Sequence, residues 1–364
     1  METLKQQLKD LVEDLPQLFA RLKGSLLPSC VHFNDILNLE TQYTRTLQEW
    51  LGGRIAKADS DLVVNRVIQA LLTIIDAIQP SDLKPEISGE SQTALHDYHR
   101  FTCDRVDQSD RFQQLFAEKR EQKTHFFYLL GMDLQSHRGM FRRIAYDLEG
   151  RLQDYLNPGI EFKYKSLQIE LTFDVSRDPD IYKQNILKSL FASLSIRVNE
   201  HEPLMDKDIT WLKKQSPLLD GLGAEDFVSI FVGISEWDWD KDITPAVTRW
   251  FITEFCKGEM PQGFPTILFF FAIIYEDDDS PIEQEVKAVL QQSTHVTALP
   301  ELGMVNMRDI GAWFNKYSFI APSARELKDL RTQHFGASNE HYMDDVERVL
   351  LQLIDEYNKK FFNG

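Results

Sequence analysis

The chain has 364 residues, of which 43% are hydrophobic and 24 are phenylalanine, so it is long enough for two or three domains with real cores. Its formal net charge of −17 argues against general binding to nucleic acid or anionic membranes, because both favour basic surfaces. The three cysteines lie far apart with no CxxC pair, so neither a disulfide framework nor a metal site is expected.

The first part of the chain, residues 1–78, shows only helical periodicity and predicts a small all-α bundle. One helix is expected over residues 33–51, because Gly52 and Gly53 follow it directly. A later helix, over residues 62–78, has a wide apolar face.

Either Asp59 or Ser60 is expected to cap that later helix at its N-terminus. The polar, amphipathic N-terminal segment differs from a signal peptide, and the longest apolar run, residues 267–275, is about half a membrane span. A cytoplasmic location is therefore expected.

Residues 79–95 contain two prolines, a glycine and several serines, which is typical of a linker. From residue 96 on, apolar runs alternate with helical segments, and this predicts a doubly wound parallel sheet in an α/β domain over residues 96–320. Residues 321–364 are expected to form C-terminal helices of the same domain. The expected strands are residues 126–130, 167–173, 227–234, 266–275 and 295–298.

The segment from Phe126 to Gly150 has the layout of a phosphate-binding loop: an apolar strand, a glycine at Gly131, and a helix beginning near Gly139 and reaching Tyr155. A working P-loop needs a second glycine, a lysine for the β- and γ-phosphates, and a serine or threonine for Mg²⁺.

Counted from Gly131, those three positions hold Ser136, His137 and Arg138, and none has the required chemistry. Two interpretations stay open: an eroded P-loop, or an ordinary turn that never bound nucleotide. Arg138, Arg142 and Arg143 could meet an anion at the helix N-terminus or could simply lie on the helix surface.

The second element of a P-loop site is an acidic residue at the end of a core strand. Ser235 takes the place of a metal-binding aspartate here, so only Glu236 keeps relevant chemistry. Trp237 and Trp239 follow. Their indoles either fold back onto the core or contact a partner, since tryptophan is enriched in interfaces.

Two further groups have simple structural interpretations. The acidic run Glu276–Asp279 lacks the spacing of a calcium loop and favours a solvated turn. His99 and Cys103 lie four residues apart, but no second ligand pair accompanies them, so a buried structural cysteine is expected.

The stretch from Tyr98 to Phe116, with FFYLLG, FVSIFVGISEWDWD, LPELG and MRDIGAWFNKY after it, resembles the inactive STAND family. That family is related to the STAND signalling NTPases and keeps the P-loop fold without an intact Walker A motif. The resemblance covers residues 96–364. In intact STAND proteins a lysine and a threonine or serine would stand at His137 and Arg138, and an acidic pair at Ser235 and Glu236. Because this chain lacks them, the resemblance implies neither hydrolysis nor a tightly bound cofactor.

Residues 1–78 resemble the effector-associated, death-like helical domains of bacterial conflict systems, on the stretch from Leu37 to Asp76. This resemblance implies a partner: an effector protein that carries a similar helical domain, with possible self-association. The residues that could face such a partner are Tyr43, Arg45, Arg54, Asn65 and Arg66, although Tyr43 could equally be core and the arginines solvent-facing.

Together these features predict a non-enzymatic adaptor or sensor of a bacterial defence system. Two alternatives stay open. One is a regulatory nucleotide-binding protein that uses His137, Arg138 or Arg142 in place of the lysine. The other is a constitutive oligomeric scaffold.

Overall fold

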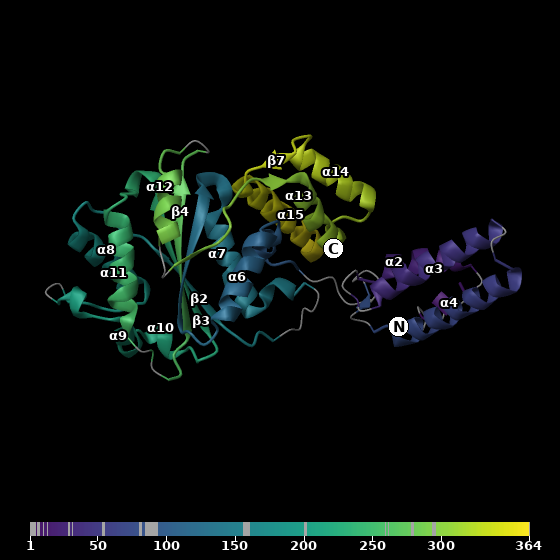
Figure 1. Ribbon diagram of the computed structural model, residues 1–364, viewed down its shortest axis with the longest axis horizontal. Helices are drawn as coiled ribbons and strands as arrows, with labels where there is room; N and C mark the ends of the chain where they lie inside the picture. Colours follow the sequence, from purple (N-terminus) through teal and green to yellow (C-terminus); the bar gives the residue numbers. More distant parts are fainter. Residues whose placement is uncertain are drawn as a thin grey trace. The chain divides into compact units, whose positions relative to one another are not determined.

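The computed structural model describes the chain apart from residues 1–4, 6–7, 10, 13, 28–29, 31, 53–54, 80–81, 84–93, 156–160, 200–201, 259, 261, 278–279, 293–295 and 364. The chain divides into two compact units, residues 1–93 and residues 94–364 (Figure 1). Most of the predicted linker lies outside the described residues. No helix in the described ranges is long and apolar enough to cross a membrane.

The N-terminal unit is helical and contains α2 (Leu15–Ser25), α3 (Phe33–Leu51) and α4 (Lys57–Ala77). Asp14 caps α2 by accepting a hydrogen bond from the N–H of Gln17. The predicted end of α3 is confirmed, because Gly52 follows it and donates its N–H to the carbonyl of Gln48. Leucine, isoleucine and valine side chains from all three helices fill one apolar core.

The predicted cap of the last helix in this unit is wrong. Helix α4 begins at Lys57, after an extended Ala56, so Asp59 lies in its first turn instead of at the cap. There the carboxylate still interacts favourably with the positive end of the helix dipole. The helical character of the unit is confirmed; a death-like arrangement stays a prediction.

The second unit is built on a five-stranded parallel sheet in the order β2-β3-β4-β1-β5. Its strands are β1 (Thr124–Met132), β2 (Ser166–Leu171), β3 (Phe227–Ser235), β4 (Thr266–Tyr275) and β5 (Thr297–Ala298). The prediction of a parallel α/β sheet is confirmed. Strand β4 is central and nearly all of its side chains are buried, as a strand covered on both faces requires.

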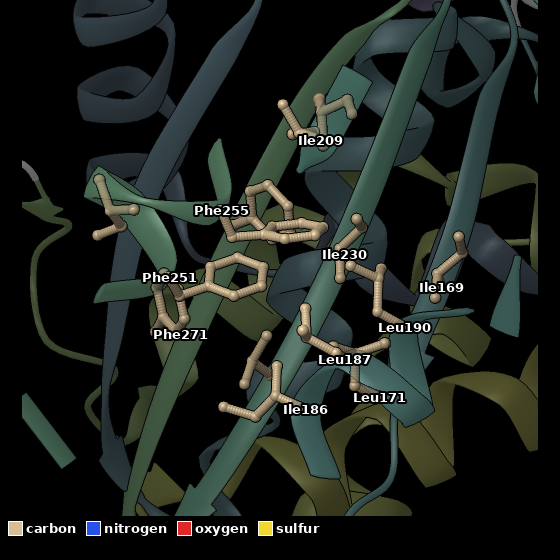
Figure 2. Close-up of a cluster of buried hydrophobic side chains, with 14 of the residues drawn as sticks. Ile169, Leu171, Ile186, Leu187, Leu190, Ile209, Ile230, Phe251, Phe255 and Phe271 are labelled. Atoms are coloured by element: carbon tan, nitrogen blue, oxygen red, sulfur yellow. The ribbon is translucent and has the colours of Figure 1, made fainter. Parts of the chain in front are cut away.

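One face of the sheet is covered by α8 (Pro179–Ser193), α9 (Ile209–Gln215), α10 (Pro217–Asp220), α11 (Ile243–Thr253) and α12 (Glu283–Gln292). Figure 2 shows part of this core, where Phe251 and Phe255 meet Phe271 and Ile230. Alternate residues of the same strands face the other way.

On the opposite face lie α6 (Val106–Glu118) and α7 (His137–Glu149), with Phe112 and Phe141 packed on Phe270. The predicted bounds of α7 are corrected at both ends. It begins two residues before Gly139, and it stops at Glu149 because Gly150 adopts a left-handed conformation (φ 78°) that ends the helix.

Three C-terminal helices, α13 (Met307–Lys316), α14 (Ala324–Phe335) and α15 (Met343–Asn363), share an apolar cluster that includes Leu95 and Cys103. Ser323 precedes α14 and caps it by accepting from the N–H of Glu326. Strand β6 (Val305–Asn306), directly before α13, pairs with β7 (Glu340–His341), which lies between α14 and α15.

Candidate functional site

The two P-loop-like elements lie at the carboxyl edge of the sheet. Gly131 at the end of β1 and Ser235 at the end of β3 are both in register with Ile274 of the intervening strand β4. The β1–α7 loop (residues 131–138) and Glu236 therefore flank the end of β4. In open parallel sheets this edge is the usual place for ligands.

Close packing explains the glycine that begins the β1–α7 loop. A Cβ on Gly131 would lie 2.7 Å from the carbonyl oxygen of Leu302, and the N–H of Leu302 donates to the carbonyl of Leu130. Any side chain at this position would push the segment after β5 away from β1. The loop continues as a single turn, η3 (Asp133–Gln135), and Ser136 then adopts a left-handed conformation (φ 52°) before α7 begins.

A carboxylate from a distant helix occupies the N-terminal end of α7. Ser136 donates its hydroxyl to Oε2 of Glu347, over 2.7 Å, and a Cβ built on Gly139 would lie 2.0 Å from Oε1 of Glu347. Glu347 belongs to α15 and is buried. Burial raises its pKa to about 7, although the hydrogen bond from Ser136 acts in the opposite direction.

The residue at the lysine position cannot supply a positive charge. His137 is 3% exposed, and burial together with the nearby Arg105 guanidinium lowers the pKa of its imidazole to about 3. The ring is therefore neutral at physiological pH.

The arginines of α7 are engaged by the protein. Arg138 donates to Oε2 of Glu170 (2.9 Å) and Arg142 donates to Oε1 of the same residue (2.8 Å). Arg143 donates to the backbone carbonyls of Phe101 and Asp104. Arg138 is exposed, in agreement with the interpretation that these arginines lie on the helix surface. Arg143 differs, because it holds the segment before α6.

The acidic residue after β3 has a structural role. Oε2 of Glu236 accepts from the N–H of Glu276 (3.0 Å) and from the hydroxyl of Ser280 (2.8 Å), so it organises the turn after β4. The neighbouring Ser235 donates to Asp238. Within the described residues no three His, Cys, Asp or Glu side chains are placed to hold a metal ion, and part of the acidic run, residues 278–279, lies outside them.

The two tryptophans after β3 differ from each other. Trp239 packs against the main core and donates Nε1–H to Glu285, as the folded-back interpretation expects. Trp237 is 79% exposed and its Nε1–H bonds only to Glu276 at the surface. Only Trp237 is therefore available to a partner.

In the N-terminal unit, Tyr43 is half-buried against Phe19 and lines a groove of about 620 Å³ together with Leu47, Trp50 and Val64. Arg45 is exposed and pairs with Glu49. Asn65 and Arg66 are exposed on α4, and Arg54 lies outside the described residues.

Sequence reasoning missed two side chains at the loop. Arg105 is buried and donates to the carbonyls of Gly303 (2.7 Å) and Gln135 (3.0 Å), which ties the loop to the segment before α13. Glu347 lies 211 residues from Ser136 along the chain. The signal that could have found it is its spacing from Met343, Leu350 and Ile354, which places a glutamate on the apolar face of a helix.

Residues 100–273 match the family model of inactive STAND proteins. The match spans β1 to β4 and includes the β1–α7 loop and Glu236. The N-terminal unit and helices α13 to α15, with Glu347, lie outside it. No curated protein matches the chain.

A nucleotide phosphate does not fit the β1–α7 loop in this structure. The lysine position holds a neutral, buried imidazole. The helix N-terminus, where a phosphate binds in a working P-loop, is occupied by the side chain of Glu347.

Proposed function

We propose that this chain is a non-enzymatic adaptor or sensor of a bacterial conflict system, which recruits an effector protein through its N-terminal helical unit. The observation that carries the non-enzymatic part is the loop itself. It lies in the segment similar to inactive STAND proteins, it lacks the lysine and the hydroxyl that a P-loop needs, and its helix N-terminus meets Glu347.

The recruiting role is assigned to the N-terminal unit because its candidate contact residues are polar and exposed. Arg45, Asn65 and Arg66 lie on the surfaces of α3 and α4, and Tyr43 lines the groove that residues of α2, α3 and α4 border. Dispersed polar contacts of this kind suit an association that can be switched on, since they give specificity without a large apolar patch. The exposed Trp237 provides a contact residue on the α/β unit.

The test is co-purification of this chain with the effector proteins encoded beside its gene, comparing wild type with Arg66→Glu. Arg325→Glu is the matched control, because Arg325 is an equally exposed arginine on α14 in the other unit. We expect capture of an effector with a helical domain to be lost only in Arg66→Glu and Arg45→Glu. Capture that survives both changes would exclude this face.

The two alternatives give different results. A scaffold forms the same oligomer with or without a partner, whereas an adaptor stays monomeric in sedimentation velocity until the effector is added. A regulatory NTPase is stabilised by nucleotide.

A further inference from the structure

The side chain of Glu347 lies against the N-terminus of α7, where its Oε2 accepts from Ser136 and its buried Oε1 has no hydrogen-bond partner among the described residues. Helix α7 has 13 residues, and its first N–H groups have no acceptor in the preceding turn of the helix. The N-cap residue, Ser136, makes no side-chain bond to those groups because its hydroxyl donates to Glu347 instead. A negative group at this end of a helix is favoured by the helix dipole.

Only glycine is compatible with this arrangement. Oε1 of Glu347 lies 2.0 Å from the position of a Cβ on Gly139, far inside any van der Waals contact. Gly139 thus leaves the space that the carboxylate fills.

Charged groups offset part of the cost of burying this carboxylate. The Arg100 and Arg105 guanidinium groups both favour the ionised form of Glu347, and Arg105 is itself buried beside the loop. Asp344, one turn earlier on α15, opposes it. Burial outweighs the two cations, so the pKa of Glu347 is raised on balance.

We infer that Glu347 is an internal ligand, which takes the place of a nucleotide phosphate at the N-terminus of α7 and holds the first turns of α15 on the β1–α7 loop. The loop is then closed to external anions as long as α15 stays docked. This inference concerns the α/β unit alone and does not depend on which partner the N-terminal unit binds.

The same helix also holds the beginning of the α/β unit. The side chain of Asn358 accepts from the N–H of Leu95 (2.9 Å) and donates to its carbonyl (2.7 Å). Eleven residues separate Glu347 from Asn358, so about 16 Å of one helix connects the loop with the point where the linker enters this unit. Because both side chains belong to α15, release of Glu347 from the loop would also affect that entry point.

The test is hydrogen exchange of the full chain in Glu347→Ala, with Glu356→Ala as the control, because Glu356 is an exposed glutamate on the same helix. We expect exchange to rise on the order of ten-fold in residues 131–139 and 343–350 of Glu347→Ala, as for a local loss of about 1.4 kcal/mol. Glu356→Ala should leave both segments unchanged.

Inorganic phosphate is the probe for the vacated position. Phosphate, compared with chloride at equal ionic strength, should restore most of the protection in Glu347→Ala and should not stabilise the wild type. A rise in exchange that phosphate does not reduce would show an ordinary packing role and overturn the inference. If Glu347→Ala does not fold, the wild type decides: a phosphate-dependent increase in its melting temperature would overturn the inference, and an unchanged temperature would support it.

Discussion

Nε2 of His99 lies 2.6 Å from Oδ1 of Asp154 in the interior of the α/β unit. Tyr98 donates to the other oxygen of the same carboxylate, and the hydroxyl of Tyr317 lies 3.0 Å from Nδ1 of His99. Burial lowers the pKa of His99 and raises that of the Cys103 thiol, so the thiol is a poor nucleophile at neutral pH. This buried network connects the turn before α6 with the end of α13.

Removing the central carboxylate of this network should be costly. Asp154→Ala leaves Tyr98 and His99 buried without their acceptor, and we expect it to lower the free energy of unfolding by about 3 kcal/mol. Asp97→Ala removes an exposed carboxylate that pairs with Arg100, and it should change the free energy of unfolding by less than about 0.5 kcal/mol. Urea unfolding of both variants checks this, and similar values for the two would contradict the assigned role of the network.

The packing of Gly139 against Glu347 predicts a coupling between the two positions. Gly139→Ala should destabilise the wild type by about 1–3 kcal/mol, because the new methyl group displaces the carboxylate. The same change should cost less in a Glu347→Ala background, where only the Ser136 hydroxyl, 2.4 Å from the new Cβ, still has to move. A double-mutant cycle measures this, and additive effects would show that the two side chains do not compete.

The raised pKa of Glu347 predicts a defined pH dependence. The folded pKa of about 7 lies above the ordinary value of 4.5, so the folded chain binds this proton more tightly than the unfolded chain. The resulting stability is fully present below about pH 4.5 and is lost as the pH rises through 7. At about 1.4 kcal/mol per pKa unit it amounts to about 3 kcal/mol at most.

Glu347→Gln removes this titration and keeps the shape of the side chain. The wild type should therefore lose stability relative to Glu347→Gln as the pH rises from 5 to 8. Glu356→Gln, on the exposed face of α15, should show no such trend. A constant difference for Glu347→Gln across this range would mean that the carboxyl titrates normally.

The two tryptophans after β3 should respond differently to truncation. Trp239→Ala removes a side chain packed on the core and should cost about 3 kcal/mol. Trp237→Ala changes an exposed side chain and should stay within about 0.5 kcal/mol. Thermal unfolding distinguishes them. Any loss of partner binding in Trp237→Ala then reports a lost contact, since the fold is intact.

Nucleotides should not stabilise this protein. Thermal unfolding with Mg²⁺-ATP, Mg²⁺-GTP and their diphosphates is expected to show no shift, whereas a ligand at a hundred times its dissociation constant would add about 2.7 kcal/mol. A shift that disappears in Arg138→Ala would instead support the regulatory NTPase. Without nucleotide, Arg138→Ala should cost less than about 1 kcal/mol, because its ion pair with Glu170 is partly exposed.

Local interactions made much of the fold predictable. Strand β4 was found with its observed bounds because both of its faces are buried, so that its sequence is an unbroken apolar run. The end of α3 at Gly52 was found because it depends on residues within one helical turn. The start of α4 was not found, since Ala56 makes no side-chain cap bond.

The sequence by itself determined that the P-loop residues are missing, because the lysine and threonine positions follow from a short count after Gly131. Only the tertiary structure decided what stands in their place. Glu347, Arg105 and Asn358 reach their partners across 211, 198 and 263 residues of chain, respectively, and no periodicity or local motif encodes such contacts. The contacts of Glu347 and Asn358 form because the apolar face of α15 packs into the core it shares with α13 and α14, which places these two side chains against the loop and against Leu95.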